Sequence, residues 1–440
     1  MDAGAVNEED YYNLVDTGII ELTDEDDKRD QNKVQYGKMA AAISRYKEFT
    51  NIELPDINTA RFGFTPDVEG NSIMFGLRGI SRVGEQNIND IVINRPYLSL
   101  EHFLFKMTTK DGKKLISKDR VVNLIKAGAF DKLENKPREQ ILKDYVLSVC
   151  DQKQKLNLMN YSMLMKKGLM PPELNFSGKV YNFTKYIRKM RYRGNYILDE
   201  LGYSFYSENY DLSKLKQTTN DAGELVWVIG EKTWDAIYDN EMNKVRAYIK
   251  QNHDRLLTQL NTILFEEEYN KYGAGDILKW ELDSLSFYYS GHPLEKVAAQ
   301  LEQVESIKNL REDDFDGFWM IKGKRVPKYR LHTIAGSVID KDKTKGLVTL
   351  STPDGVIDMK LYKQQYAILS HQLSDLDEEG NKIVTEESFV EKGTFLLVTG
   401  ILRNNLFVPK VYKDTGFEPI LKIILNQDGF VDCLLKKSEE

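Results

Sequence analysis

Two different patterns of hydrophobic and polar positions divide the chain. Between residues 33 and 290, apolar residues recur mostly at the spacing of amphipathic helices, and Lys244–Tyr269 is the clearest example. Leu54-Pro55 ends an early helical stretch, since the residue before proline avoids the helical region, and Glu69-Gly70-Asn71 lies between two apolar runs like the turn of a hairpin. From residue 332 to residue 411 the pattern changes to an alternation with a period of two, which is typical of strands. The sequence therefore predicts a helical region followed by a region of strands.

The alternating region predicts five strands. They are His332–Asp340, Gly346–Ser351, Val356–Leu361, Thr394–Leu402 and Leu406–Val411. Turn-forming residues separate most of them, and Tyr362–Ser370, between the third and the fourth, has helical spacing. Five strands with one helix in that place is the layout of an OB-fold β-barrel, which we expect over residues 319–412. The helical middle region carries one expected short strand, Glu224–Ile229.

Glycines mark the start of a helix in Gly76–Val92, GLRGISRVGEQNINDIV. A glycine in a tight turn permits positive φ and lets another backbone come close, and the N–H groups at the following helix N-terminus suit a phosphate. Asp119–Leu133 repeats the arrangement, with a helical pattern that runs into Ala127-Gly128-Ala129-Phe130. The pair resembles a tandem helix-hairpin-helix module. The alternative for the first unit, taken alone, is a plain corner between two helices with a glycine C-cap.

Composition narrows the class of protein. A chain of 440 residues is too long for one ordinary core and predicts two to four domains. It is 41% hydrophobic and 29% charged, as soluble globular proteins are, and has no apolar run of membrane length. The formal net charge of −7 argues against a surface coated with phosphate contacts but leaves room for local basic patches. Two cysteines and five scattered histidines predict neither a disulfide framework nor a zinc site.

Several motifs, in their order, resemble one family. LPDIN (Leu54–Asn58), the two glycine hairpins with their helices, and SLEHF (Ser99–Phe103) are similar to the region after the fingers in the alpha subunit of bacterial DNA polymerase III, the family C replicative polymerases. SFYYSGHPLE (Ser286–Glu295) resembles the landmark that precedes the OB domain of that family. The resemblance covers most of residues 35–135 and 281–412. Residues 160–280 look unlike the family, and the tail after Val411 is short for the usual C-terminal docking domain.

The resemblance implies a multidomain α plus β chain with a definite order of parts. We expect a remnant of the fingers over 1–75, a tandem helix-hairpin-helix domain over 76–150, a mostly helical connecting or inserted region over 151–318, the five-stranded OB barrel over 319–412, and a short tail over 413–440. Because the chain starts at Met1, it fits either a natural product of a split gene, as viruses sometimes have, or a shortened piece of a longer polymerase.

The chemistry of nucleotidyl transfer is expected elsewhere. It needs carboxylates that hold two metal ions, and in family C these lie in the palm, upstream of every motif matched above. Asp24–Asp27 belongs to a charge run that is better explained as solvated, and Asp340 and Asp342 sit in a loop between strands with lysines around them. We therefore expect no catalytic residue and no cofactor in this chain, and Mg²⁺ on a partner chain that carries the palm.

The two hairpins are the expected grip on duplex DNA behind the active site. Their backbone N–H groups and nearby basic side chains position a duplex without reading its sequence. The candidates are Arg78, Gly79, Arg82, Val83, Gly84, Lys118, Arg120, Lys126, Ala127 and Gly128. For any one basic residue the alternative is a solvated surface charge. Arg82 stands where the family usually has a small residue or one that tolerates left-handed φ, so it either strains the hairpin or reaches a phosphate.

Single-stranded template is expected on the barrel, because basic residues beside a stacking aromatic suit an unpaired strand. The candidates are Lys322, Lys324, Arg325, Lys328, Tyr329, Arg330, Lys341, Lys343 and Lys345. The alternative for the first six is a solvated lead-in to the first strand. Lys179–Tyr196 interleaves six basic residues with aromatics, and either contacts nucleic acid or packs its aromatics inward.

A sliding clamp is a further candidate partner. Gln154–Met159, QKLNLM, resembles the short peptide with which the family grips its clamp, and it lies where the family places that peptide. Its candidate contact residues are Gln154, Leu156, Leu158 and Met159. The alternative is a helix that continues through the segment with Leu156 and Met159 in its core.

The sequence as a whole predicts the non-catalytic C-terminal part of a family C DNA polymerase, bound to double- and single-stranded DNA in a bacterial or infected-host cytoplasm. The alternative is a free-standing DNA-binding accessory protein of replication. A structural or regulatory protein that reuses the fold without DNA comes third.

Overall fold

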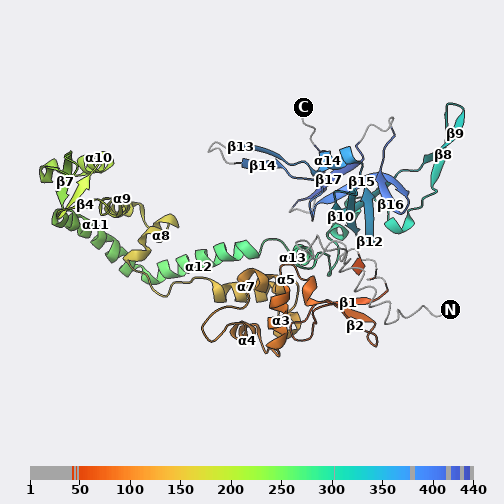
Figure 1. The fold of residues 1–440 in the computed structure, drawn as a ribbon, viewed down its shortest axis with the longest axis horizontal. Coiled ribbons are helices and arrows are strands. Elements are labelled where there is room, and N and C mark those ends of the chain that lie inside the picture. The colour runs from red at the N-terminus through yellow and green to blue at the C-terminus, as the bar shows by residue number, and fades with distance from the viewer. Residues whose placement is uncertain are drawn as a thin grey trace. The chain divides into compact units, whose positions relative to one another are not determined.

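The computed structural model describes residues 42, 43, 46, 49–301, 303–376, 382–412, 418–426 and 431–436. The chain divides into two compact units (Figure 1), one formed by the described residues of Met1–Asp144 and Gly273–Glu440 and the other by Tyr145–Tyr272. The acidic segment Glu21–Asp30, with Asp24–Asp27, lies outside the described residues, as does most of the helix expected between residues 33 and 49.

The first unit begins with a small sheet. Its strands are β1 (Asn51–Glu53), β2 (Thr65–Asp67) and β3 (Ser72–Met74), in the order β1-β3-β2. β2 and β3 pair antiparallel around a turn in which Asn71 has φ 45°, so the hairpin expected at Glu69-Gly70-Asn71 is confirmed. β1 runs parallel to β3 and joins the preceding chain to this hairpin.

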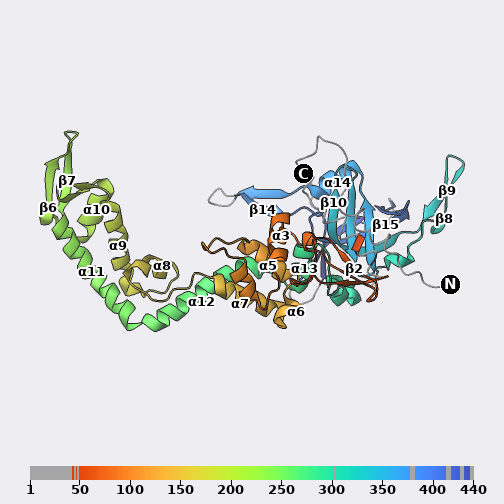
Figure 2. The ribbon, with the colours of Figure 1, turned by 60° about the horizontal axis from the view of Figure 1, so that its bottom comes forward.

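Short helices follow and enclose an apolar core. A 3-10 turn, η1 (Leu77–Gly79), leads to α3 (Glu85–Ile93), α4 (Leu100–Lys106), α5 (Lys118–Lys126), α6 (Asp131–Glu134) and α7 (Arg138–Val149) (Figure 2). Leu77, Ile80, Phe103, Leu124 and Phe130 are fully buried among them. Both glycine hairpins predicted from the sequence are present, one before α3 and one between α5 and α6. The first helix-hairpin-helix motif would begin with a helix, but the chain forms only the 3-10 turn η1 there.

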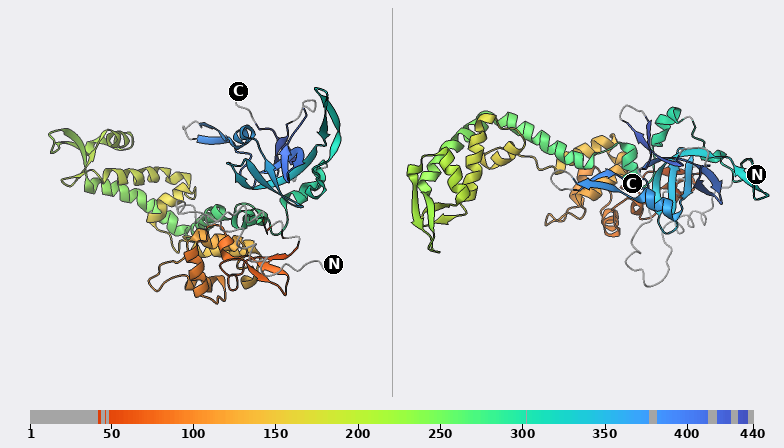
Figure 3. Two further views of the ribbon diagram at one scale, coloured as in Figure 1. Left: turned by 45° about the vertical axis from the view of Figure 1, so that its right-hand side comes forward. Right: turned by 90° about the horizontal axis from the view of Figure 1, so that it is seen from above.

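The second unit joins two long helices to a small sheet (Figure 3). Its helices are η2 (Leu158–Asn160), α8 (Tyr161–Lys166), η3 (Pro172–Leu174), α9 (Asn175–Ile187), α10 (Glu200–Asn209), η4 (Leu212–Lys214), α11 (Glu231–Gln251) and α12 (His253–Tyr272). Its strands are β4 (Arg191–Tyr192), β5 (Asn195–Leu198), β6 (Leu215–Thr219) and β7 (Leu225–Gly230), in the order β4-β5-β7-β6.

The mostly helical character expected for the middle of the chain is confirmed, and so is the strand at Glu224–Ile229, which is β7. The sequence did not foresee the three strands that pair around it. The single helix expected over Lys244–Tyr269 is broken at Asn252, where the Asn252 side chain donates to the carbonyl of Tyr248 at 3.0 Å and ends α11.

The remainder of the first unit carries a β-barrel. α13 (Ile277–Leu285), η5 (Pro293–Gln300) and η6 (Ile307–Asn309) precede it, and two strands, β8 (Phe315–Ile321) and β9 (Lys324–Tyr329), form a separate two-stranded sheet. The barrel strands are β10 (His332–Asp342), β11 (Leu347–Thr352), β12 (Gly355–Lys360), β15 (Phe395–Arg403) and β16 (Leu406–Pro409), with α14 (Lys363–Ser370) between β12 and β15. All five strands and the helix were predicted at these places.

Strand pairing closes the barrel. β10 pairs with β11 on one side and β15 on the other, β12 runs parallel to β16, and β16 pairs with β15. β10 bends at an irregularity between Val338 and Asp340, as closure of a small barrel requires. Gly400 lets β15 approach its neighbour closely, because a Cβ there would lie 2.3 Å from the carbonyl oxygen of Val408. Ile334, Val348, Met359, Val398 and Phe407 fill the interior.

The barrel sheet extends past the boundary that the sequence suggested. β17 (Ile420–Leu425) pairs with β15, and β18 (Val431–Leu434) pairs with β17, within the segment expected to be a short tail. Ile420 and Ile423 are buried against the sheet, so this pairing removes apolar surface from water. A second hairpin, β13 (Leu373–Leu376) and β14 (Lys382–Glu386), also forms its own two-stranded sheet.

Candidate nucleic-acid interface

The first hairpin, Leu77–Gly84, presents an exposed turn ahead of α3. Arg82 has φ 65°, in the left-handed region that side chains other than glycine and asparagine rarely adopt. Its side chain is exposed, while Val83 beside it is buried under the turn. The turn therefore needs a residue with left-handed φ at this position, and Arg82 adopts that conformation.

Three backbone donors are unused where this hairpin enters α3. The N–H groups of Gly84, Glu85 and Gln86 have no hydrogen-bond partner in the part of the chain that the structure describes, and Gly84 makes no side-chain cap. All three residues are exposed. Open N–H groups at a helix N-terminus, with an exposed arginine next to them, can receive one phosphate group of a nucleic-acid backbone.

Side chains of α5 hold the first hairpin in shape. Asn123 donates from Nδ2 to the carbonyl of Ser81 at 3.0 Å, and Arg120 donates from Nε to the carbonyl of Arg82 at 3.2 Å. On the other side, the Ser81 N–H donates to the carbonyl of Ser284 at 2.8 Å. The two helix-hairpin-helix motifs therefore support each other, since α5 of the second motif fixes the backbone of the first hairpin. Arg120 serves this purpose with Nε and is also half-exposed beside the turn.

The second hairpin has a different role. The N–H groups of Ala127, Gly128 and Ala129 donate back to the carbonyls of Asn123, Ile125 and Leu124, at 2.9 to 3.0 Å, and all three residues are buried. The structure thus corrects the expectation that Ala127 and Gly128 offer donors to DNA, because those donors already close the C-terminus of α5. Gly79 and Val83 are corrected for the same reason, as their N–H groups donate to Gly76 and Ile80. Gly84 alone keeps the predicted open donor.

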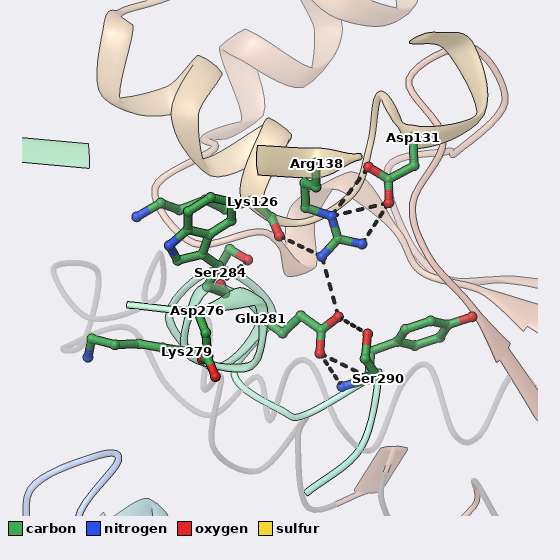
Figure 4. Close-up of polar contacts among 10 residues, drawn as sticks. Lys126, Asp131, Arg138, Asp276, Lys279, Glu281, Ser284 and Ser290 are labelled. Atoms are coloured by element: carbon green, nitrogen blue, oxygen red, sulfur yellow. Dashed lines mark hydrogen bonds and ion pairs between the residues drawn. The ribbon is translucent and has the colours of Figure 1, made fainter. Parts of the chain in front are cut away.

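A buried ion-pair network packs the second hairpin against α13 (Figure 4). Arg138 donates to Asp131 at 2.6 Å, to the carbonyl of Lys126 at 3.1 Å and to Glu281 at 3.3 Å. Glu281 is completely buried and accepts two further hydrogen bonds from Ser290 and one from the N–H of Tyr289. Ser290 belongs to the SFYYSGHPLE segment, so that segment closes the network.

The same segment also contacts the barrel. Tyr288 and Ser337 of β10 share a hydrogen bond of 2.9 Å between their hydroxyls, and His292 lies 3.0 Å from the carbonyl of Ser351 in β11. Within this unit, SFYYSGHPLE therefore joins the helix-hairpin-helix module to the barrel. Its polar side chains Tyr288, Ser290 and His292 make the connecting hydrogen bonds.

The other basic candidates of the module differ in their surroundings and exposure. Arg78 lies over the ring of Phe62 at 5.2 Å, and Lys126 lies over Trp280 at 5.5 Å. Burial lowers the pKa of Lys126. Lys118 is half-buried at the start of α5. Among the predicted cations of the module, Arg82 is the exposed one at the open turn, so the interface centres on Arg82, Gly84 and the half-exposed Arg120.

Basic side chains also gather on one edge of the barrel. A groove of about 800 Å³ runs between the β10–β11 turn and α14, and Lys343, Lys345, Lys360, Lys363 and Tyr362 line it. The sequence singled out Lys343 and Lys345 but missed Lys360, Lys363 and Tyr362, which only the fold brings near them. Lys341 points elsewhere and pairs with Glu391 at 2.6 Å. The groove has room and charge for an anionic strand.

The remaining barrel candidates lie on the β8–β9 hairpin. Lys322, Lys324 and Arg325 are exposed near its turn, while Lys328 and Tyr329 are half-buried. Arg330 follows the hairpin and lies 3.9 Å from both Glu305 and Asp314. Lys324, Arg325, Lys328 and Tyr329 belong to β9, which pairs with β8, so the lead-in to the barrel is itself a hairpin.

The clamp-peptide candidates have mixed environments in the second unit. Leu156 is buried in the core beside α8 and α12, and its N–H donates to Nε2 of His253 at 3.1 Å. Gln154 is exposed, Leu158 is half-buried, and Met159 is 85% exposed. The alternative of one continuous helix through Leu156 and Met159 is wrong, because α7 ends at Val149 and Met159 points to solvent. For the basic and aromatic run Lys179–Tyr196, the aromatics Tyr181, Phe183 and Tyr196 are buried, as the alternative of inward packing requires.

The fold defines a class: a nucleic-acid-binding module of paired hairpins joined to a closed five-stranded barrel. Residues 50–141 match the family model described as the helix-hairpin-helix motif. The chain is 34% identical to a probable DNA polymerase, YorL, of Bacillus subtilis (strain 168), over 98% of this chain and 33% of that protein, and matches a DNA-directed DNA polymerase of Bacillus phage SPbeta to the same extent. An 89-residue stretch is 39% identical to the DNA polymerase III subunit alpha of Aquifex aeolicus (strain VF5), covering 20% of this chain and 8% of that protein.

These relatives confirm the resemblance to the DNA polymerase III alpha subunit. The chain spans about a third of the length of the two Bacillus relatives. In the residues that the structure describes, no helix is both long and apolar enough to cross a membrane, and no three histidine, cysteine or acidic side chains are grouped as metal ligands.

Proposed function

We propose that this chain is the DNA-gripping part of a family C replicative polymerase. In this role the first hairpin holds the primer–template duplex, and the barrel holds single-stranded template. Nucleotidyl transfer, with its Mg²⁺, belongs to a palm carried by a separate chain. The support is the relationship to proteins named DNA polymerases, together with a hairpin that has the donors and the charge for a phosphate.

The observation that carries the proposal is the open first hairpin. Its exposed arginine lies two to four residues before the three unused N–H groups at the start of α3, and within the described chain these N–H groups have no hydrogen-bond partner. Contacts of this kind bind any duplex and release counterions, so affinity should fall steeply as salt rises.

A binding experiment tests the grip. We expect the chain to bind a fluorescent primer–template duplex in an anisotropy titration, and Arg82→Glu to weaken that binding several-fold. Arg193→Glu is a matched control, since Arg193 is also an exposed arginine at a left-handed turn position, with φ 46°, but lies in the second unit. Equal affinity of wild type and Arg82→Glu would rule out the first hairpin as the grip.

A second experiment tests the division of labour. The chain would be purified under native conditions from its own source and co-purifying chains identified by mass. A partner that carries palm aspartates, with primer extension only when both chains are present, is the expected result. A chain that binds DNA but purifies alone and never supports extension would favour the free-standing accessory protein.

A sliding clamp is proposed as a further partner. The exposed Met159 and Gln154 support this, because a clamp peptide must offer its anchors to a pocket. Leu156 would remain in the core of the second unit. We expect Met159→Ala to weaken binding to the clamp of the same source, measured by surface plasmon resonance, and to leave duplex binding unchanged.

A further inference from the structure

The β8–β9 hairpin exposes an unusual amount of apolar side chain. Its strands pair only with each other among the described residues, with Trp319 opposite Val326 and Phe318 opposite Pro327. In Figures 1 and 2 the hairpin extends outward from the barrel as an arm. The exposed apolar residues of this aromatic arm, residues 315–329, are Met320 (71%), Ile321 (52%), Phe318 (50%), Phe315 (43%), Trp319 (39%) and Val326 (37%).

An arm of this kind requires an explanation. A two-stranded hairpin is marginally stable by itself in water, and contiguous exposed apolar surface is rare on a folded protein unless it binds something. The β13–β14 hairpin is a useful comparison. It also exposes apolar side chains, among them Leu376 and Ile383, but it carries no aromatic residue.

The charge of the arm indicates its partner. Residues 315–329 contain four basic residues, Lys322, Lys324, Arg325 and Lys328, and one acidic residue, Asp316, in a chain whose net charge is −7. A local positive charge on an acidic protein attracts a polyanion, and nucleic acid carries one negative charge on every phosphate. An uncharged apolar partner would gain nothing from this positive charge.

Cations lie over aromatic rings on the arm and where it meets Lys410 and Tyr412. The guanidinium of Arg325 lies 3.8 Å from the ring centre of Phe318, and the ammonium of Lys328 lies 5.1 Å from that of Trp319 and 5.8 Å from that of Tyr412. Lys410 lies 5.4 Å from the ring of Tyr329 and 5.3 Å from that of Tyr412. A flat base can stack on a ring face that remains open while a neighbouring cation meets its phosphate.

We propose that the aromatic arm binds unpaired nucleic acid by base stacking on Phe318 and Trp319, with Arg325 and Lys328 at the phosphates. The inference deepens the proposed DNA-binding function and rests on it. It adds a stacking surface outside the barrel, built mainly from β8, to the barrel surface expected for the single strand. Every base has a flat face, so the arm should accept any sequence.

Fluorescence gives a direct readout, because Trp319 is the exposed one of the chain's four tryptophans. Trp234 and Trp280 are buried and Trp227 is half-buried. We expect an oligothymidylate to quench the emission of the intact chain, and an abasic strand of the same length and charge to quench it far less. Trp319→Phe should lose the signal but keep the affinity, because phenylalanine still offers a ring.

Affinity gives the second readout. Trp319→Ala and Phe318→Ala should each weaken oligothymidylate binding by at least about fivefold, since stacking on one aromatic contributes that much. Ile383→Ala, on the hairpin that lacks aromatics, is the matched control and should bind like wild type. Wild-type affinity in both alanine variants, or equal binding of abasic and thymidylate strands, would overturn the proposal, as would an arm that instead captures a peptide while the strand binds unchanged.

The two failures are distinguishable. If the arm variants bind the single strand normally while Arg82→Glu loses the duplex, the arm inference fails and the proposed function stands. If the intact chain binds neither duplex nor single strand, the proposed function fails with it. Circular dichroism of each variant shows whether the fold is retained, and recovery of affinity in Trp319→Phe separates loss of the ring from loss of structure.

Discussion

Arg138 and Glu281 stand 143 residues apart in the sequence and form a buried ion pair, with Nη1 of the arginine 3.3 Å from Oε1 of the glutamate. Arg138 also pairs with Asp131, and Glu281 accepts hydrogen bonds from the Ser290 segment, so neither charge is left unsatisfied (Figure 4). The pair holds the helix-hairpin-helix module against α13. Any substitution that removes one member leaves the other charge buried without its partner.

Glu281→Ala should therefore destabilise the chain strongly. Breaking a buried ion pair by removing one partner costs about 3–5 kcal/mol, because the remaining charge is uncompensated. Chemical denaturation of both proteins measures the difference in free energy of unfolding. Lys132→Ala, which breaks the exposed pair with Glu53, is the control and should cost less than about 1 kcal/mol. Equal costs for the two variants would show that the network does not stabilise the fold.

Gly128→Ala should destabilise the fold, whereas Gly84→Ala should not. Gly128 has φ 83°, and a Cβ there would lie 2.7 Å from Nη2 of Arg138 and 3.0 Å from Oδ2 of Asp131. Left-handed φ alone costs alanine about 1–2 kcal/mol, and displacement of the ion pair adds to that cost. Gly84 has φ −83° and no atom within 4 Å of its Cβ position. In thermal unfolding, the midpoint temperature should fall for Gly128→Ala and stay unchanged for Gly84→Ala. A normal midpoint would mean that the second hairpin adapts freely.

Arg82→Gly should separate strain from binding. Glycine adopts φ 65° without penalty, so the variant should be as stable as wild type or more stable, by up to about 1 kcal/mol. It also loses a phosphate contact, so the slope of log affinity against log salt for the duplex should fall by about 1. Unfolding and anisotropy titrations measure the two effects. A gain in stability with an unchanged salt slope would show that Arg82 does not touch the backbone of DNA.

His292 should make the chain sensitive to acid. Burial lowers the pKa of His292 to about 4. Its Nδ1 accepts from the N–H of Leu294, and its Nε2 donates to the carbonyl of Ser351. Tyr288 and Phe395 pack on the ring, and Glu295 and Asp354 are the nearby carboxylates. Because the folded pKa lies below the ordinary value of about 6.5, the unfolded chain takes up the proton first, and stability is lost as pH falls from 6.5 toward 4.

The size of that effect is up to about 3 kcal/mol, and substitution isolates it. His292→Asn keeps a side-chain oxygen for the Leu294 N–H but cannot titrate. We expect its free energy of unfolding to depend less on pH than that of wild type between pH 4 and 6.5, measured by denaturation at several pH values. Identical pH profiles would show that His292 is not the sensitive group.

Prediction from the sequence succeeded where a pattern is local. The period-two alternation gave all five barrel strands, and glycines next to helical patterns gave both hairpins. It failed at positions that pair across long distances. Lys360 and Lys363 join Lys343 in one groove only because α14 and the β10–β11 turn meet. β17 was assigned to a tail because its pairing partner, β15, lies many residues earlier.

The two hairpins show what each level decides. The residues around Gly84 and Gly128 look alike in sequence, and local chemistry determines that both segments turn. Tertiary packing decides which one can bind. Gly128 is enclosed by Arg138 and Asp131, and the N–H groups beside it already close α5, whereas the donors at Gly84 remain open. Turn formation depends on backbone preferences of adjacent residues, but exposure depends on what the rest of the chain places on top of them.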